Sequence, residues 1–366
     1  MSNFRTILKI AKLFSLKAIV KIADALSLTK KYSSLSPQNC LIISTTGLGD
    51  TIFGTPAIRE LKKKYPRMIL SALTKAGGRE ILYNNPNVNR IYVLRKGIFD
   101  LFSLLADIRK SRFDTVIIFH CTDRILWLLA YLTGASNIIG SDRERHNKGM
   151  DFLLTNPVSM LSATHPIYER FLLVNELNVK ADSIKMDFFI SDKDKGASLD
   201  GVDDQKLLIG FQPGSARRYQ RWPKKYFVSL GRLLKEKFED VVIVVTGSNQ
   251  ERILVESIAK EINGISLAGL SIGKTAELMK QCSLFVSNDT GPMHISVAIG
   301  TPTIALCSAT GGSCGPYKQL ETFVSIEKEK PCDECEGKSC NNPVCMEQIS
   351  PEEVFEKATE MLSVTV

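Results

Sequence analysis

A glycine-rich turn early in the chain carries a carboxylate that could act as a general base. The segment Ser44–Thr51 reads Ser-Thr-Thr-Gly-Leu-Gly-Asp-Thr and follows a short apolar run. Gly47 and Gly49 allow the backbone to turn tightly and to approach a ligand. Asp50 then emerges where a strand ends, and it could accept the proton of a substrate hydroxyl there. The alternative is that Asp50 only caps a helix that begins near Gly54.

A second polar turn, Val286–His294, follows another apolar run and precedes a helix. It reads Val-Ser-Asn-Asp-Thr-Gly-Pro-Met-His. Thr290, Gly291 and the first amides of the helix would offer hydroxyl and N–H donors to an anion such as a diphosphate, and the helix dipole favours that charge. Pro292 fits the first turn, because its missing N–H is not needed there. An ordinary turn is the alternative to this phosphate site.

A third segment, Phe211–Lys224, combines a Gly-Ser turn at Ser215 with several cations. Its sequence is Phe-Gln-Pro-Gly-Ser-Ala-Arg-Arg-Tyr-Gln-Arg-Trp-Pro-Lys, and the cations are Arg217, Arg218, Arg221 and Lys224. Guanidinium groups bind phosphate oxygens in pairs, whereas lysine acts as a point charge. The alternative is a solvated loop in which Trp222 anchors the following helix, and we expect that anchor in either case.

Each of these segments follows a predicted strand, because the chain alternates short apolar runs with amphipathic stretches. In the first half the predicted strands are Leu41–Ser44, Met68–Leu73, Arg90–Val93, Thr115–Phe119 and Asn137–Ile139, and the predicted helices are Thr55–Lys64, Gly78–Asn84, Phe99–Lys110 and Ile125–Leu132. Continuous β-branched runs such as Thr-Val-Ile-Ile-Phe are typical of parallel strands covered by helices on both faces.

The alternation fades over about residues 141–205, which are polar, and then starts again. In the second half the predicted strands are Leu207–Phe211, Val241–Thr246, Leu284–Ser287 and Thr303–Leu306, and the predicted helices are Lys224–Lys237, Gln250–Ile262, Thr275–Cys282, His294–Ile299 and Pro351–Leu362. The pattern predicts an α/β protein with two doubly wound domains, at 37–190 and 191–350, followed by a C-terminal helix at 351–366. Ligands are then expected at the carboxyl ends of the strands and in a cleft between the domains.

The composition is that of a globular protein, and its net charge is unevenly placed. The 366 residues are 44% hydrophobic and 23% charged, with a net charge of +8. Residues 1–36 hold seven basic residues and one acidic residue, so they carry +6 of that charge. The rest of the chain is nearly neutral, so the composition does not indicate a surface that binds nucleic acid. The sequence predicts neither a membrane span nor a signal peptide, so we expect a cytoplasmic protein.

The basic segment 1–36 has an apolar stripe at helical spacing. The stripe consists of Ile7, Ala11, Phe14, Ala18, Ile22 and Ala25, with lysines over much of the remaining surface. Such a helix could lie on an anionic membrane surface, or it could dock on the protein itself.

The nine cysteines predict reduced thiols rather than a disulfide framework, since five are scattered through the body of the chain. The other four, Cys332, Cys335, Cys340 and Cys345, form a C-x₂-C-x₄-C-x₄-C cluster. This cluster could hold a structural zinc ion, or it could consist of reduced or redox-labile thiols. We expect no catalytic metal and no cofactor.

Taken in order, these motifs resemble glycosyltransferase family 9, the heptosyltransferases of lipopolysaccharide core synthesis. The resemblance runs from about Cys40 to the C-terminus through Gly-Leu-Gly-Asp-Thr-Ile-Phe-Gly-Thr-Pro, Pro-Gly-Ser with Arg-Trp-Pro, Val-Thr-Gly-Ser, and Asn-Asp-Thr-Gly-Pro-Met-His. It implies a GT-B architecture of two Rossmann-like domains. It also implies inverting, metal-independent transfer, typically from ADP-heptose to a lipid-linked glycan, at the cytoplasmic face of the inner membrane.

The resemblance also assigns residues. Asp50 matches the catalytic base of the family, and Gly47, Gly49 and Thr51 form the turn on the acceptor side. The residues that match or are expected in the donor site are Ser215, Arg218, Arg221, Lys224, Gly247, Ser248, Glu251, Asp289, Thr290, Gly291 and His294. One position departs from the family, because Gln220 stands where many members have lysine. Another nucleotide sugar and another cell-surface acceptor are therefore an alternative, and a non-catalytic nucleotide-binding module is a third.

Overall fold

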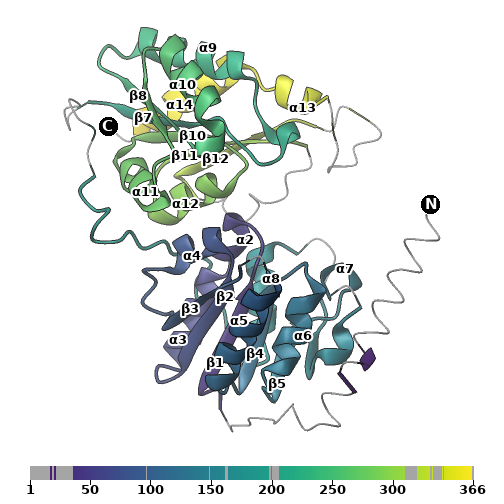
Figure 1. Ribbon diagram of the computed structural model, residues 1–366. Coiled ribbons are helices and arrows are strands. Elements are labelled where there is room, and N and C mark those ends of the chain that lie inside the picture. Colours follow the sequence, from purple (N-terminus) through teal and green to yellow (C-terminus); the bar gives the residue numbers. More distant parts are fainter. Residues whose placement is uncertain are drawn as a thin grey trace. The chain divides into compact units, whose positions relative to one another are not determined.

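The computed structural model describes residues 17–18, 20–21, 36–95, 97–147, 149–160, 164–197, 199, 206–309, 320–329, 332, 340 and 342–364. The chain divides into two compact units, Met1–Ile184 (unit 1) and Lys185–Val366 (unit 2) (Figure 1). The sequence pattern places the boundary between residues 190 and 191.

Within the described residues, unit 1 is built on one six-stranded parallel sheet. Its strands are β1 (Asn39–Ser44), β2 (Ile69–Thr74), β3 (Arg90–Val93), β4 (Thr115–His120), β5 (Asn137–Ser141) and β6 (Asn156–Val158). They lie in the order β3-β2-β1-β4-β5-β6, so the direction of winding reverses between β1 and β4. The central strands are almost wholly buried, as their continuous apolar runs predict.

Two of the described helices of unit 1 begin at a residue whose side chain caps them. The helices of this unit are α2 (Leu48–Ile52), α3 (Thr55–Lys64), α4 (Ala76–Leu82), α5 (Ile98–Lys110), α6 (Arg124–Leu132), α7 (Glu144–Asn147), the 3₁₀ turn η1 (Asp151–Leu153) and α8 (Pro166–Asn175). The Asp123 carboxylate accepts a hydrogen bond from the first turn of α6, and the His165 ring does the same for α8. Three lysines in the last turn of α3 complement its dipole.

Unit 2 repeats this architecture in the part of the chain that is described. Its strands are β7 (Leu208–Gln212), β8 (Val242–Gly247), β9 (Ile265–Ala268), β10 (Leu284–Asn288), β11 (Thr303–Cys307) and β12 (Phe323–Glu327). They form one sheet in the order β12-β11-β10-β7-β8-β9. Counted from its own first strand, this is the strand order of unit 1, and the reversal lies between β7 and β10. Both sheets therefore have the Rossmann order.

Helices cover both faces of the unit 2 sheet. They are η2 (Arg218–Gln220), α9 (Lys224–Lys237), η3 (Asn249–Glu251), α10 (Arg252–Glu261), α11 (Ile272–Gln281), α12 (Gly291–Ile299), α13 (Val344–Glu347) and α14 (Pro351–Val364). In Figure 1, α9, α10 and α14 lie over one face, whereas α11 and α12 lie over the other. The C-terminal helix α14 packs against α9 and places Val354, Ala358 and Leu362 in the core of unit 2.

The sequence prediction fails over residues 144–175, where the structure has regular elements rather than a faded pattern, whereas the described residues from 176 to 199 contain no helix or strand. Strand β6 and helix α8 both lie in this stretch, and Phe171, Leu173 and Val174 of α8 are buried. Helix α8 was missed because its buried face includes Glu169 and Arg170, which interrupt the apolar periodicity. The strands β9 and β12 were missed because they are short and place only Leu267, Phe323 and Ile326 as buried apolar residues.

Several helices also begin or end at residues other than those predicted. The segment predicted to form a helix at Gly78–Asn84 is helical from Ala76 to Leu82, and the one predicted at Thr275–Cys282 begins at Ile272. In the second case the Ser271 hydroxyl caps the earlier start by accepting from the Lys274 amide at 3.2 Å. Helix α12 begins at Gly291 rather than His294, since Thr290 takes the extended conformation of a cap residue.

Only a few residues of the basic N-terminal segment are described, and they are helical. Val20 packs against the hydrophobic cluster of unit 1, and the Lys17 ammonium lies 5.1 Å from the centre of the Phe152 ring. Ala18, which the predicted stripe includes, is exposed. The rest of that stripe lies outside the described residues.

Among the described residues, no helix is both long and apolar enough to span a lipid bilayer.

Candidate functional site

In both units polar and charged residues lie at the ends of the two strands at which the winding reverses. In unit 1, Asp50 comes after β1 and His120 ends β4. In unit 2, Ser215 comes after β7 and Asp289 comes after β10. In doubly wound sheets the crevice at this reversal, at the carboxyl ends of the strands, is where ligands bind. The two groups of residues are described separately below.

Asp50 lies in the first turn of the short helix α2, which the sequence prediction placed in a turn. Its Oδ2 atom accepts a hydrogen bond from the Gly47 amide at 3.3 Å. The contact is a capping contact, but it caps α2 itself and not a helix that begins near Gly54. The side chain of Asp50 keeps 30% of its surface exposed, so its carboxylate remains accessible to an acceptor hydroxyl.

His120 faces Asp50 from the end of the neighbouring strand. Its Nδ1 atom lies 3.8 Å from Asp50 Oδ2 and 2.8 Å from Thr46 Oγ1. The strand ends are themselves joined, because the Thr45 amide donates to the His120 carbonyl at 3.0 Å. On its other side the His120 ring meets the edge of His146 of α7, at 6.1 Å between centroids. His120 was not among the predicted site residues.

Arg170 of helix α8 is the second cation near Asp50. It is fully buried, and its Nη1 atom bonds Glu169 Oε2 at 3.2 Å. Arg143 reaches Glu169 from the other side at 3.6 Å. Among the described atoms, Nε and Nη2 of Arg170 have no hydrogen-bond partner. A buried guanidinium is costly, so its position beside the carboxylate indicates a function for its charge.

These neighbours keep Asp50 ionised. Burial by itself raises the pKa of Asp50, but the charges of His120 and Arg170 and hydrogen bonds from Thr46 and Gly47 outweigh it, so the pKa lies below its ordinary value. The contribution of His120 exists only while its ring is protonated. An ionised carboxylate that is partly exposed at the end of β1 has the properties that a general base needs.

Replacing His120 with asparagine should shift the acid limb of the kcat–pH profile toward higher pH. The asparagine amide can keep the hydrogen bond to Thr46, but it carries no charge, so the pKa of Asp50 should rise. His120→Ala should in addition lower kcat, because the Thr46 contact is lost. Rates measured from about pH 4 to pH 8 test this. Profiles of H120N and the unaltered protein that superimpose would show that His120 does not act on Asp50.

The remaining predicted residues of the turn support the backbone. Gly47 precedes α2 and Gly49 lies within it, whereas Thr51 is buried and donates its hydroxyl to the Gly47 carbonyl at 3.2 Å. Gly78 of α4 packs so closely on Thr51 that a side chain at position 78 would collide with it. Thr51 therefore holds the turn and helix α4 together from within.

In unit 2, Asp289 and His294 are buried together beside the start of α12. The His294 Nε2 atom lies 3.9 Å from Asp289 Oδ1, and Gln220 donates its side-chain amide to Asp289 Oδ2 at 3.3 Å. Thr290 and Gly291 are the cap and first residue of this nine-residue helix. The structure thus gathers four of the predicted donor-site residues at one helix N-terminus, where the dipole favours an anion.

Asn288 ties the two loops of unit 2 together, a role that the sequence analysis missed. Its Oδ1 atom accepts from the Trp222 amide at 3.0 Å, and its Nδ2 atom donates to the Pro213 carbonyl at 2.8 Å. Ser215, also buried, accepts the Arg221 side chain on its carbonyl at 2.8 Å. Asn288 is the buried last residue of β10, and a polar amide directly after the predicted apolar strand was the signal that could have revealed it, since a buried amide needs partners.

The two other predicted cations lie differently. Arg218 is exposed on η2, so its guanidinium is accessible to phosphate oxygens. Lys224 instead pairs with Glu261 at the end of α10, at 2.6 Å. The structure therefore ties Arg221 to the Gly-Ser loop, leaves Arg218 exposed and pairs Lys224 with a neighbouring helix.

Glu251 lies against the Gly-Ser loop. Its Oε2 atom accepts hydrogen bonds from the Ser248 amide at 2.9 Å and from the Ser248 hydroxyl at 2.8 Å, directly after Gly247 ends β8. Its other carboxylate oxygen lies so close to Gly214 that any side chain there would overlap it. The predicted donor residues after β8 and the loop after β7 thus form one surface.

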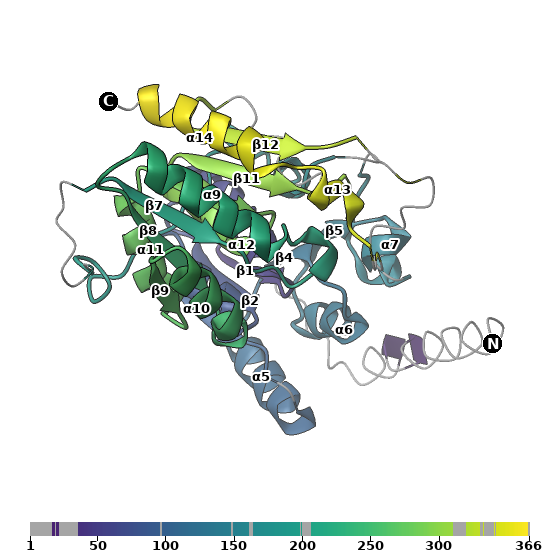
Figure 2. The same cartoon turned by 90° about the horizontal axis from the view of Figure 1, so that it is seen from above.

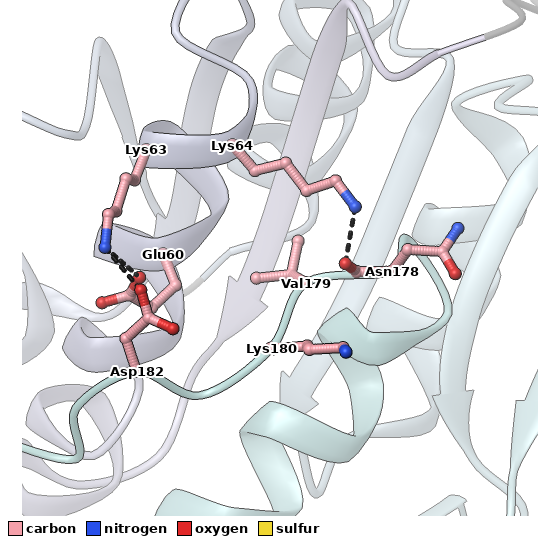
Figure 3. Close-up of a pocket in the computed structure, with 7 residues that line it drawn as sticks. All are labelled: Glu60, Lys63, Lys64, Asn178, Val179, Lys180 and Asp182. Atoms are coloured by element: carbon pink, nitrogen blue, oxygen red, sulfur yellow. Dashed lines mark hydrogen bonds and ion pairs between the residues drawn. The ribbon is translucent and has the colours of Figure 1, made fainter.

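A pocket of about 300 Å³ lies elsewhere on unit 1 and contains none of the predicted site residues (Figure 3). Lys63 pairs with Asp182 and Lys64 bonds the Asn178 carbonyl, so these lysines join α3 to the segment after α8. Lys62 on the same turn bonds the Met68 carbonyl next to the start of β2. The pocket therefore lies at the sheet edge opposite Asp50.

Four of the scattered cysteines, Cys40, Cys121, Cys282 and Cys307, are buried, as predicted. Burial raises the pKa of the Cys121 thiol to about 11 and that of Cys282 to about 12. In the cysteine cluster Cys332 is exposed and Cys340 and Cys345 are half-buried, whereas Cys335 lies outside the described residues. The described part of the chain contains no group of three or more potential ligands placed to hold a metal ion.

Comparison with known proteins links this geometry to a family. Residues 101–344 match the model of glycosyltransferase family 9 (heptosyltransferase). Lipopolysaccharide heptosyltransferase 3 of Escherichia coli K12 is 27% identical over 289 residues, which cover 72% of this chain and 80% of that protein. The lipopolysaccharide core heptosyltransferase OpsX of Haemophilus influenzae is 20% identical over 299 residues, 80% of this chain and 86% of its own.

Solved structures agree on the fold. A glycosyltransferase family 9 protein of Veillonella parvula superposes with a TM-score of 0.75 at 22% identity, covering 90% of this chain and 98% of its own. The E. coli ADP-heptose heptosyltransferase II superposes with a TM-score of 0.73 at 19% identity, covering 89% and 99%. The architecture is that of the GT-B glycosyltransferases, and the chain belongs to glycosyltransferase family 9, the heptosyltransferase family.

Proposed function

We propose that this protein transfers heptose from ADP-heptose to a lipopolysaccharide core acceptor, with inversion at the anomeric carbon and without a metal ion. Its family is one of glycosyltransferases, and the relatives named above act on lipopolysaccharide. The observation that carries the proposal is the partly exposed carboxylate of Asp50 after β1, which lies 3.8 Å from His120 Nδ1 and accepts a hydrogen bond from the Gly47 amide.

In the proposed reaction Asp50 is the base. Its carboxylate takes the proton of an acceptor hydroxyl while that oxygen forms a bond to the anomeric carbon of the heptose. The bond between this carbon and the diphosphate oxygen breaks at the same time, and the electron pair leaves with ADP. Thr46 and the Gly47 amide orient the carboxylate of Asp50 before the acceptor binds.

The donor site is assigned to unit 2. The N-terminus of α12, with Thr290 and Gly291, supplies amide donors for the diphosphate. Arg218 and Arg221 add positive charge from the Gly-Ser loop, and charge in place before the reaction stabilises a departing anion. Glu251 can accept hydrogen bonds from ribose hydroxyls through the carboxylate that faces Gly214.

A donor screen tests the proposal. ADP-heptose at 100 times its dissociation constant should stabilise the protein by about 2.7 kcal/mol against unfolding, whereas UDP and GDP sugars should not. Transfer to a core acceptor should follow and should persist in EDTA. Stabilisation by a UDP or GDP sugar instead would favour the second candidate, a family member with another donor, which Gln220 suggests because it carries no charge. Donor binding without transfer to any acceptor would indicate a non-catalytic module.

Gly214→Ala should weaken binding of ADP-heptose about tenfold without unfolding the protein. The new methyl group overlaps the Glu251 carboxylate, which can rotate away, so stability is spared while the proposed ribose contact is lost. The dissociation constant from calorimetry tests this. Ala216→Ser is the control, since Ala216 is an exposed position of the same loop. Equal affinity in G214A would argue against ribose recognition by Glu251.

We also propose that the protein works at the cytoplasmic face of the inner membrane, with residues 1–36 on the lipid surface. The charge of +6 supports this, because basic residues near an anionic surface are attracted to it. Deleting residues 1–36 should reduce binding to vesicles that contain phosphatidylglycerol and should spare transfer to a soluble acceptor. If the deletion does not reduce vesicle binding, the alternative holds, in which residues 1–36 form a helix that docks on the protein itself.

A further inference from the structure

Helix α5 is apolar on two opposite faces, although only one of them is covered. Ile108 is buried, and Leu101, Leu104 and Leu105 pack with it on the hydrophobic cluster of unit 1. On the outer face, by contrast, Phe99 keeps 86% of its surface exposed and Phe102 keeps 64%. Residues three apart lie on the same side of a helix, so the two rings form one exposed aromatic patch.

The aromatic patch differs from ordinary surface exposure. Single exposed hydrophobic side chains are common, and Ile253 of α10 is an example in unit 2 at 85% exposure. Two neighbouring exposed phenylalanines in the first two turns of one helix are unusual. Exposed clusters of aromatic residues mark surfaces that bind something apolar. Figure 2 shows α5 reaching outward from the rest of its unit.

The patch lies at the catalytic edge of the unit 1 sheet. Helix α5 starts five residues after β3 ends, so its first turn is at the carboxyl edge, the same edge from which Asp50 emerges. Strand β3 is separated from β1 only by β2, a spacing of about 10 Å between the two strands. A surface that touches Phe99 is therefore close to the hydroxyl that Asp50 would activate.

Exposed basic side chains of unit 1 suit an anionic surface. Arg95 is exposed directly before the helix, and Lys17 and Lys21 of the N-terminal segment are exposed as well. Val20, between those two lysines, packs on the same hydrophobic cluster as Leu101 of α5. The basic segment and the aromatic helix are thus joined to one core, and basic residues together with exposed phenylalanine are the composition of membrane-surface anchors.

We propose that Phe99 and Phe102 insert into the surface of an anionic lipid bilayer and hold unit 1 where its lipid-linked acceptor lies. The lipid link of the acceptor rests on the proposed function, whereas the binding of lipid by α5 can be measured by itself. In this arrangement the basic segment supplies attraction that salt screens, and the two aromatic rings supply attachment that salt does not weaken.

The test compares three full-length proteins: the unaltered protein, the double variant Phe99→Ser/Phe102→Ser, and the control variant Ile253→Ser. The control removes an equally exposed side chain from unit 2. Each protein is sedimented with vesicles of phosphatidylethanolamine and phosphatidylglycerol in high salt, where the basic segment contributes little. The binding of the double variant to vesicles should be at least about tenfold weaker than that of the unaltered protein. The I253S variant should bind like the unaltered protein. All replaced side chains are exposed, so the fold is retained, and a thermal unfolding curve verifies this.

Two outcomes would overturn the proposal. One is equal sedimentation of the double variant and the unaltered protein, or no sedimentation of either. The other is a loss of transfer by the double variant to a water-soluble acceptor without acyl chains, since that would place the rings on the acceptor sugar rather than on lipid. If the unaltered protein binds vesicles but transfers nothing from ADP-heptose, the proposed function fails and the lipid contact of α5 stands.

Discussion

Asp50→Ala should lower kcat for heptose transfer by about 10²–10⁴-fold while the affinity for ADP-heptose stays nearly unchanged. That range is the usual contribution of a positioned general base. Asp50 is in unit 1, whereas the proposed donor contacts are in unit 2, so removing its carboxylate leaves the donor site intact. Single-turnover rates measured with saturating donor, together with a dissociation constant from calorimetry, separate the two effects.

Asp50→Asn is the matched control for this experiment. The amide keeps the size of the side chain and can still accept from the Gly47 amide, but it cannot take a proton at neutral pH. We expect D50N to be as slow as D50A, with a thermal stability close to that of the unaltered protein. Transfer by either variant at the original rate would mean that another group is the base.

Trp222→Ala should reduce the free energy of unfolding of unit 2 by about 3–5 kcal/mol, the usual cost of emptying a large aromatic site in a core. Trp222 is 2% exposed, and its ring meets Phe227 edge to face at 4.8 Å between centroids. Its indole N–H donates to the Ile349 carbonyl at 2.9 Å, next to the start of α14. The side chain thus joins the donor loop, α9 and the C-terminal helix, and denaturant unfolding measures its loss.

Trp222→Phe separates packing from hydrogen bonding in the same position. Phenylalanine keeps most of the ring contact but leaves the Ile349 carbonyl without its donor, which should cost about 1–3 kcal/mol. A W222A protein as stable as the original would contradict the packing described here. A destabilised W222A that still binds ADP-heptose when folded would show that Trp222 supports the donor loop without contacting the donor.

The local chemistry of the strand ends was readable from the sequence. Apolar runs of β-branched residues predicted the central strands of both sheets, and the glycines and polar residues after them predicted where ligands bind. Asp50, Ser215 and Asp289 follow central strands, as predicted. These features are local, because strand formation, tight turns and helix caps depend on residues within a few positions of one another.

The partners of those residues were decided by the tertiary structure. His120 reaches Asp50 across 70 positions, and Arg170 reaches it across 120, because the sheet places β4 beside β1 and α8 near both. Lys224 is the opposite case, because it is close in sequence to the donor loop but forms its ion pair with Glu261 of α10. The sequence determined which groups stand at the strand ends. The packing of distant elements decided which charges surround them, because electrostatic forces depend on distance in space and not along the chain.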